Sequence, residues 1–205
     1  MRNIAIIDYG LCNLDSVVRA VEICGAQPLP TRTPEDLEEA DGLILPGVGA
    51  FPDAMAGLEQ QGFVEPLRRL VLDQARPFLG ICLGMQLMAE YGVEGGERAG
   101  LGLVPGKVVR LLPDAPGTRV PHVGWNEVHH LRPCPLFEGI PTGRDFYFVH
   151  SYHFAAREDH ILATTPYCGS FASVVGRGTL FGTQFHPEKS LADGLKTLRN
   201  FIALC

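Results

Sequence analysis

Basic residues are in the minority in this chain of 205 residues: 17 lysines and arginines stand against 23 aspartates and glutamates, giving a formal net charge of −6. Proteins that bind nucleic acid or an anionic membrane through general electrostatics carry a basic surface. The composition therefore argues against both kinds of partner. Hydrophobic residues make up 46% of the chain and charged residues 20%, which favours a folded core over disorder.

Long apolar runs are also missing. The most apolar stretch, residues 78–93, is interrupted by Gln86 and Glu90 and is shorter than the ~20 apolar residues that a membrane-spanning helix needs. The chain reaches Asp8 too early for a secretory signal, so we expect a cytoplasmic protein with reduced thiols. None of the six cysteines forms a C-x-x-C pair and the histidines show no ligand spacing, so we expect no metal and no cofactor.

Short apolar runs and helical stripes alternate along the first half of the chain. The expected strands are residues 4–7, 29–32, 42–45 and 77–81, and the expected helices are residues 13–24, 54–60, 64–74 and 85–91. This order predicts an α/β fold: an open, mixed, mostly parallel sheet with helices on both faces.

The second half has a different pattern. Between residues 107 and 185, β-branched and aromatic residues recur in short runs separated by Gly and Pro, which indicates mostly strands, some of them antiparallel. The chain ends on a helical stripe with Ser190 as its expected N-cap, and Thr33 is expected to cap an earlier helix. No repeat or linker divides the sequence, so we expect one domain over residues 1–205.

Residues 80–84 read Gly-Ile-Cys-Leu-Gly between an expected strand and an expected helix. A nucleophile at such a sharp turn takes a strained backbone conformation, and glycines beside it permit close packing. Cys82 would then lie at a helix N-terminus, which stabilises a thiolate, and the Leu83 N–H would face a developing oxyanion. Alone, the motif is more often a buried structural cysteine, so a second signal is needed.

His186-Pro187-Glu188, after another expected strand, is that second signal. A residue before proline is held extended, so the side chains of residues 186 and 188 point to the same side, and the carboxylate can orient the imidazole. The C-terminal ends of parallel strands share the sheet edge at which ligands bind in open α/β folds. We therefore predict that Cys82, His186 and Glu188 form a catalytic triad.

Two nearby segments offer binding groups. Residues 46–49 (Pro-Gly-Val-Gly) follow a strand, and the glycines around Val48 permit the peptide to rotate, so that an N–H of this segment becomes a second oxyanion donor. By itself the segment is an ordinary turn. Gln86 lies one helical turn after Cys82, where it can bind a polar substrate or remain a surface amide.

Three segments, residues 46–49, 80–86 and 185–188, resemble the signatures of class I (triad-type) glutamine amidotransferases. Four more, residues 8–16, 121–126, 147–152 and 186–190, resemble the glutaminase subunits of imidazole glycerol phosphate synthase within that class. The resemblance spans essentially the whole chain. One departure is Cys12, where the family more often has glycine, which leaves the shape of the first loop open.

The resemblance implies a flavodoxin-like three-layer fold and the hydrolysis of glutamine through a thioester on Cys82. His186 would transfer the proton and Glu188 would orient and stabilise its cation. The oxyanion donors would be the N–H groups of Leu83, Val48 and Gly49. The residues that bind glutamine would be Gly47, Gln86, Ser151 and Tyr152.

The resemblance also implies a partner, a cyclase subunit with a (βα)8 barrel. In a heterodimer the barrel would use the ammonia to make imidazole glycerol phosphate and an aminoimidazole carboxamide ribotide in histidine biosynthesis. The implied interface residues are Asn13, Trp125, Asn126 and Lys189. Trp125, the only tryptophan, is either an interface anchor or a core residue, and Lys189 either pairs with an acid of the partner or is solvated.

Three alternatives remain. One is the glutaminase subunit of pyridoxal 5'-phosphate synthase, which residues 121–126 disfavour. Another is a cysteine peptidase or chaperone-like hydrolase, in which the histidine would have a different context. The third is a non-catalytic regulatory subunit of the same fold, which the intact Cys82, His186 and Glu188 disfavour.

Overall fold

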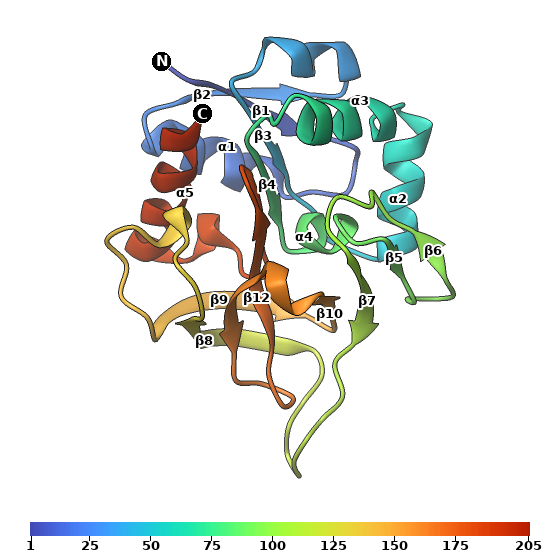
Figure 1. The fold of residues 1–205 in the computed structure, drawn as a ribbon, viewed down its shortest axis with the longest axis vertical. Coiled ribbons are helices and arrows are strands. Elements are labelled where there is room, and N and C mark those ends of the chain that lie inside the picture. Colours follow the sequence, from blue (N-terminus) through green and yellow to red (C-terminus); the bar gives the residue numbers. More distant parts are fainter.

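A large mixed sheet forms the centre of the computed structural model, which describes residues 1–205 (Figure 1). Nine strands lie in the order β2-β1-β3-β4-β13-β12-β11-β8-β9. The parallel part contains β2 (Gln27–Thr31), β1 (Asn3–Ile7), β3 (Gly42–Leu45), β4 (Phe78–Ile81) and β13 (Leu180–Thr183). Antiparallel pairing adds β12 (Phe171–Arg177), β11 (Ile161–Thr165), β8 (His122–His130) and β9 (Arg144–His150).

A smaller four-stranded sheet lies beside the large one. It contains β10 (Tyr152–Ala156), β7 (Gly106–Arg110), β5 (Tyr91–Gly92) and β6 (Arg98–Ala99). The strand-rich second half that the sequence predicted is therefore confirmed, and it supplies strands to both sheets. Because β10 follows β9 after one residue, Ser151 lies where the chain leaves one sheet and enters the other.

Helices cover both faces of the large sheet, as predicted. One face carries α1 (Leu14–Ile23) and α5 (Leu191–Leu204), and the other carries α2 (Phe51–Gln60), α3 (Val64–Arg68) with a π-turn at Arg69–Asp73, and α4 (Leu83–Leu87). Short 3-10 turns occupy Pro34–Glu39, Pro135–Phe137, Glu158–His160 and Pro187–Lys189. No helix combines the length and the apolar character that crossing a bilayer requires.

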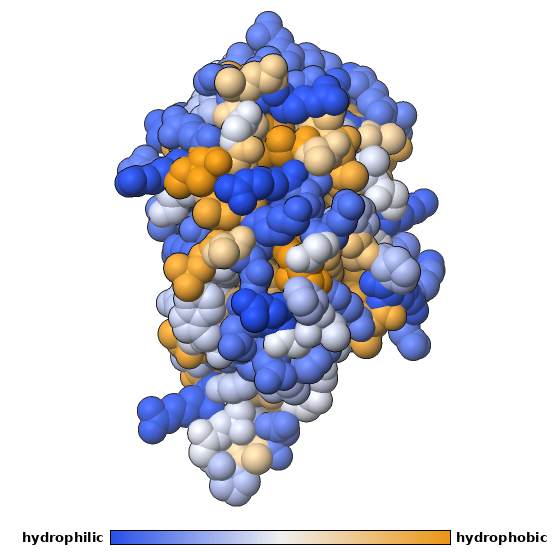
Figure 2. Space-filling model, turned by 90° about the vertical axis from the view of Figure 1, so that its left-hand side faces the viewer, coloured by the Kyte–Doolittle hydropathy of each residue, from blue (hydrophilic) through white to orange (hydrophobic).

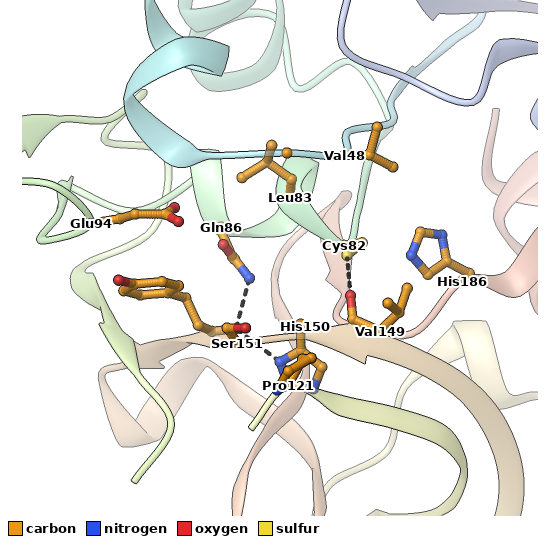
Figure 3. A pocket seen from close by; sticks show the side chains of 12 residues that line it. Val48, Cys82, Leu83, Gln86, Glu94, Pro121, Val149, His150, Ser151 and His186 are labelled. Atoms are coloured by element: carbon orange, nitrogen blue, oxygen red, sulfur yellow. Dashed lines mark hydrogen bonds between the residues drawn. The ribbon is translucent and has the colours of Figure 1, made fainter. Parts of the chain in front are cut away.

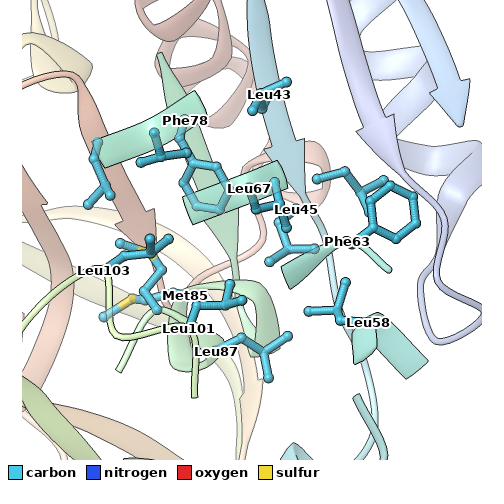
Figure 4. Packing of buried hydrophobic residues seen from close by; sticks show 14 of the residues in the cluster. Leu43, Leu45, Leu58, Phe63, Leu67, Phe78, Met85, Leu87, Leu101 and Leu103 are labelled. Atoms are coloured by element: carbon cyan, nitrogen blue, oxygen red, sulfur yellow. The ribbon is translucent and has the colours of Figure 1, made fainter. Parts of the chain in front are cut away.

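Strand alternation divides the core into two clusters. Ile4 and Ile6 of β1 pack with α1 and α5, whereas Ala5 and Ile7 pack on the opposite face. Figure 4 shows part of the second cluster, in which side chains of β3, α2 and α4 meet. Complete burial of one such leucine or phenylalanine contributes about 1.5–3 kcal/mol, so this cluster holds α4 firmly against the sheet.

The surface over α1 and α5 is mixed in polarity. Figure 2, which looks onto that side of the molecule, shows apolar areas as separate islands among hydrophilic side chains. Ile23 and Leu191 are among the exposed apolar residues of these two helices. Scattered apolar residues of this kind are normal for a protein surface.

The helix expected over residues 85–91 is wrong in its bounds, because α4 is Leu83–Leu87 and Tyr91 begins β5. The reason is tertiary. The backbone carbonyls of Leu87, Met88 and Ala89 accept hydrogen bonds from the N–H groups of residues 101–104 instead of continuing the helix. The periodicity of the sequence indicates the apolar stripe, but it does not reveal these long-range hydrogen-bond partners, which end the helix early.

Thr33 and Ser190 are the N-cap residues of their helices, as expected, but neither makes a side-chain cap hydrogen bond. Before the 3-10 turn at Pro34–Glu39, the Thr31 hydroxyl accepts the N–H of Thr33 at 3.0 Å. The Ser190 hydroxyl instead donates to the His186 carbonyl at 2.7 Å and accepts the N–H of Tyr147 at 3.0 Å. Ser190 therefore ties the end of the His186 segment to β9.

Candidate active site

Cys82 occupies a sharp turn between β4 and α4. Its φ is +53° and its ψ is −108°, a conformation that residues with a Cβ rarely adopt. Gly84 makes the turn possible, because a Cβ at this position would lie 1.8 Å from the carbonyl oxygen of Leu45. At Gly80 a Cβ would lie 2.6 Å from the carbonyl oxygen of Gly84. The glycines beside the cysteine are thus required by close backbone approach.

His186 and Glu188 form a buried pair. The Nδ1 of His186 lies 2.8 Å from the Oε1 of Glu188, and both side chains are only 2% exposed. The His186 N–H donates to the Tyr147 carbonyl at 3.0 Å, which fixes the backbone from which the ring projects. Since the Nδ1–H donates its hydrogen bond to the carboxylate, the Nε2 atom is the one left to act on a neighbour, and Nε2 makes no hydrogen bond in this conformation.

The electrostatic surroundings of His186 favour its charged form. Burial lowers the pKa of the ring, but the nearby Cys82 sulfur and the hydrogen-bonded Glu188 carboxylate outweigh burial and raise the pKa to about 10. A cationic imidazole next to a sulfur is the arrangement that stabilises a thiolate. The site is thus built to support a thiolate–imidazolium pair.

The fold brings the cysteine and the histidine together because their strands are neighbours. β4 and β13 pair in parallel, and the Cys82 N–H donates to the Thr183 carbonyl at 2.8 Å. Both residues line one cavity of about 290 Å³, and Figure 3 shows the His186 ring beside Cys82. The sulfur also lies 3.8 Å from the Val149 carbonyl oxygen and 3.7 Å from the Nε2 of Gln184.

The oxyanion donors are only half assembled. Leu83 is the first residue of α4, so its N–H has no partner within the helix. The Val48 N–H donates to the Leu11 carbonyl at 2.9 Å and is therefore occupied. Our expectation that Val48 presents a second donor to the site is not met in this conformation. Gly49 has a φ of +100°, in the region that glycine adopts readily, so this segment has backbone freedom.

The far end of the cavity contains the other expected binding groups. Gln86, Ser151 and Tyr152 all line it (Figure 3). The Nε2 of Gln86 donates to the Tyr152 carbonyl at 2.8 Å and to the Oε1 of Gln184 at 3.1 Å. Both amide protons of Gln86 are thus used, and its Oε1 remains available as an acceptor.

Gly47 lies beneath the cavity and does not line it. A Cβ on Gly47 would meet the Tyr9 hydroxyl at 2.5 Å and the Leu83 Cβ at 2.9 Å. Its position is therefore explained by packing against the elbow. Glu94, in contrast, lines the cavity, and its carboxylate accepts the Phe51 N–H at 2.8 Å. No sequence signal points to Glu94, which lies in a short irregular loop without periodicity or a motif.

The four expected interface residues do not share one face. Trp125 is 48% exposed, so its interpretation as a core residue is wrong. Asn13 is exposed, and Lys189 is half-buried and forms no ion pair. Asn126 bonds to the buried His122. Because alternate residues of a strand point to opposite faces, Asn126 faces away from the side that shows Trp125.

An exposed apolar surface adjoins the cavity. It consists of Val123, Trp125, Tyr147 and Val149, which form cross-strand pairs on the outer side of β8 and β9, and we call it the β8–β9 face. The Trp125 and Tyr147 rings meet edge to face at 6.0 Å. Val149 belongs both to this face and to the cavity lining. An aromatic and apolar patch at the mouth of a pocket is typical of a docking surface.

The sequence model of the family described as "Glutamine amidotransferase class-I" matches residues 5–204. The chain belongs to this family, whose chemistry suits an elbow cysteine beside a buried histidine and glutamate.

Relatives narrow the comparison. The chain is 52% identical over 202 residues to "Imidazole glycerol phosphate synthase subunit HisH" of Moorella thermoacetica, covering 98% of this chain and 94% of the relative. It is 47% identical over 201 residues to "Imidazole glycerol phosphate synthase subunit HisH 1" of Campylobacter jejuni, covering 98% of this chain and all of the relative.

Solved structures support the fold. The structure of PurLQS from Thermotoga maritima matches with a TM-score of 0.78 at 18% identity, covering 100% of this chain and 99% of that chain. A structure described as glutamine amidotransferase matches with a TM-score of 0.74 at 21% identity, covering 98% and 97%. At these identities the likeness concerns architecture alone.

Proposed function

We propose that this chain is the glutaminase subunit of an imidazole glycerol phosphate synthase, with Cys82, His186 and Glu188 as its catalytic triad. The buried His186–Glu188 pair beside the elbow cysteine carries the chemical part of the proposal. The relatives of about half identity over nearly the whole chain support the specific role.

The first half of the reaction releases ammonia. The Cys82 thiolate attacks the side-chain amide carbon of glutamine, forming a C–S bond and a tetrahedral oxyanion. The imidazolium of His186 gives its Nε2 proton to the amide nitrogen, the C–N bond breaks, and ammonia leaves. The Leu83 N–H stabilises the oxyanion, and a γ-glutamyl thioester remains on Cys82.

The second half regenerates the thiolate. Neutral His186 accepts a proton from water as the oxygen attacks the thioester carbon. The C–S bond then breaks, glutamate leaves, and the cysteine returns as a thiolate beside the imidazolium. Glu188 keeps the ring oriented and stabilises its cation in both halves, without itself taking up the proton.

The free acceptors of the cavity suit the amino-acid end of glutamine. The carboxylate of Glu94 and the Oε1 of Gln86 line the same space and would receive the α-ammonium group. Backbone groups of Ser151 and Tyr152 would complete the binding of the amino-acid end. Gly47 contributes through packing, because it allows the Val48 segment to approach the elbow.

The occupied Val48 N–H suggests how a partner controls the reaction. With this N–H bonded to Leu11, the oxyanion has only one prepared donor. Rotation of the segment between Gly47 and Gly49 would turn a second N–H toward Cys82. A partner whose ligand-bound state prefers the rotated form raises activity by shifting that population.

The proposed partner is a (βα)8-barrel cyclase that docks on the β8–β9 face. This face adjoins the cavity through Val149, so docking there would help to confine the ammonia before water protonates it. Trp125 is the proposed anchor, because it is a large exposed aromatic residue and residues of this kind contribute most of the binding energy at the centres of protein–protein interfaces. Asn13 and Lys189 remain proposed contacts at its edge.

Replacing the nucleophile tests the chemical role. In the complex with the cyclase barrel, Cys82→Ala should abolish synthesis from glutamine while synthesis from added ammonia continues. Cys12→Ala is the matched control, since Cys12 lies in a loop outside the cavity and should tolerate the change. Glutamine-dependent synthesis that survives in Cys82→Ala would contradict the proposal.

Glutamate release with and without the partner tests the coupling. We expect slow release by the chain alone and strong stimulation by the barrel with its ribotide ligand. Trp125→Ala should weaken assembly by ~2 kcal/mol or more, as removal of an anchor does. Leu112→Ala is the control, because Leu112 is apolar and even more exposed than Trp125, at 73% against 48%, but lies outside the β8–β9 face. Equal rates of glutamate release with and without the barrel would contradict the proposed coupling.

A further inference from the structure

A chain of hydrogen bonds runs from β8 through β9 to the start of β10, and one of its members, His150, lines the glutamine pocket. The Nδ2 of Asn126 lies 3.2 Å from the Nε2 of His122. The Nδ1 of His122 lies 3.0 Å from the Nε2 of His150, its cross-strand partner. The Nδ1 of His150 lies 2.8 Å from the carbonyl oxygen of Tyr152. The triad uses none of these three side chains.

The hydrogen bonds of this chain can be donated in only one direction, from Asn126 toward Tyr152. The Oδ1 of Asn126 accepts the Glu127 N–H at 2.9 Å, so its amide nitrogen faces His122, and an amide nitrogen can only donate. The Nε2 of His122 must therefore accept, which places its proton on Nδ1. That proton is donated to the Nε2 of His150, whose own proton must then be on Nδ1 and be donated to Tyr152.

Both rings are buried and uncharged. His122 is 4% exposed and His150 is 6% exposed. Burial lowers the pKa of His122 to about 4 and that of His150 to about 3. Each ring consequently carries a single proton at neutral pH, as the direction of the chain requires.

The far end of the chain reaches the reacting sulfur. The carbonyl of Tyr152 has two lone pairs and accepts from His150 and from the Nε2 of Gln86. Gln86 also donates to Gln184 at 3.1 Å, and the Nε2 of Gln184 lies 3.7 Å from the sulfur of Cys82. The orientation of the Gln86 amide is thus fixed from two sides, and its Oε1 is directed to the pocket.

We propose that Asn126, His122 and His150 are positioning residues for glutamine binding. They hold the Tyr152 carbonyl in place and, through it, the Gln86 amide in the orientation that presents its Oε1 to the substrate. This inference rests on the glutaminase function proposed for the same pocket. The three residues transfer no proton in the reaction. Their substitution should therefore weaken the binding of glutamine and leave the rate of the chemical step nearly unchanged.

The test breaks the hydrogen bonds of residue 122 while keeping an aromatic ring at that position. His122→Phe keeps an aromatic side chain against Tyr167, whose ring stacks on His122 at 4.0 Å. In the complex with the barrel, KM for glutamine should rise about 10-fold while kcat changes less than about 2-fold, the pattern of lost substrate binding. His122→Asn, whose amide nitrogen replaces Nδ1, should recover part of the loss.

His153→Phe is the matched control. His153 lies on β10 in the smaller sheet, contacts Phe171 as His122 does, and has no hydrogen-bond partner on its buried Nδ1. The same substitution there should leave KM unchanged. An unchanged KM in His122→Phe, or an equal rise in His153→Phe, would overturn the proposal.

A spectroscopic readout makes the test independent of turnover and of the folding of any variant. In ¹⁵N-labelled native protein, the nitrogen shifts of His122 and His150 should show both protons on Nδ1, whereas neutral histidine in water favours Nε2. A proton on the Nε2 of His150 would overturn the inference. Failure of the proposed function would appear differently, as native protein that releases no glutamate even with the barrel and its ligand.

Discussion

His186 and Glu188 are joined by a 2.8 Å bond between Nδ1 and Oε1, with both side chains 2% exposed. His186 is extended, with φ −94° and ψ 98°, but Pro187 begins a 3-10 turn over Pro187–Lys189. The turn, and not the alternation of an extended segment that the sequence predicted, carries the Glu188 carboxylate back to the ring. A carboxylate so well shielded from water stabilises the imidazolium strongly. This pair is the structural basis for assigning the proton transfer to His186.

Glu188→Gln should lower the pKa of His186, because burial already lowers it and the substitution removes one of the charges that raise it. The amide oxygen still accepts from Nδ1, so the ring keeps its place while its cation loses support. The rate of glutamine hydrolysis should fall by at least about 10²-fold, because neutralising the carboxylate that orients a catalytic histidine causes losses of this size or larger. An NMR titration of the His186 ring in the native protein and the variant measures the shift. An unchanged pKa would contradict the assignment.

Gly84→Ala should destabilise the chain by ~3 kcal/mol or more, since its Cβ would lie 1.8 Å from the Leu45 carbonyl oxygen and overpacking against backbone cannot relax cheaply. Gly57→Ala in α2 is a graded comparison, because its Cβ would meet nothing closer than 3.1 Å. Chemical denaturation of both variants gives the free energies of unfolding. Equal losses would show that the elbow glycine is not required by close approach.

The two buried neutral histidines should make stability depend on pH. The pKa of His150 is about 3 in the folded state and about 6.5 in the unfolded chain. Below pH 6.5 the unfolded state therefore binds a proton that the folded state does not, so the free energy of unfolding decreases as the pH falls toward 3.

His150→Phe should weaken that pH dependence by up to ~1.4 kcal/mol per pH unit between pH 6 and 4. Denaturant unfolding at several pH values in this range measures the difference. His129→Phe serves as the control, because the side chain of His129 is 45% exposed and forms only a surface pair with Glu127. Parallel curves for the native protein and His150→Phe would contradict a buried neutral ring.

Much of the fold could be predicted because its signals are local. The apolar run before Asp8 and the run at residues 42–45 became β1 and β3 almost as expected. The shortened α4 could not be predicted, since its carbonyls are taken by residues 101–104 across a loop. Thr33 and Ser190 lie at the expected cap positions, but the Ser190 hydroxyl bonds to the His186 carbonyl and the Tyr147 N–H instead of capping α5.

The site shows the same division. The turn at Cys82 and the His186–Glu188 pair could be predicted from short motifs whose spacing fixes their geometry. Glu94 could not, because a loop carboxylate carries no periodicity. The role of Asn126 also depends on strand direction and on the tautomers of two distant rings, which no sequence pattern specifies.

Cys82 is the proposed nucleophile that attacks glutamine. A glutamine analogue with a diazoketone in place of its amide should alkylate this cysteine in the complex. The pKa values of the other five cysteines, Cys12, Cys24, Cys134, Cys168 and Cys205, are all raised, mainly by burial, which keeps them protonated and unreactive.

Peptide mass spectrometry after this labelling is the most direct measurement, with Cys82→Ala as the control. We predict a single adduct on Cys82, formed faster when the partner and its ligand are present and absent from the variant. Labelling of another cysteine at a similar rate, or no adduct on Cys82 in the active complex, would contradict the account.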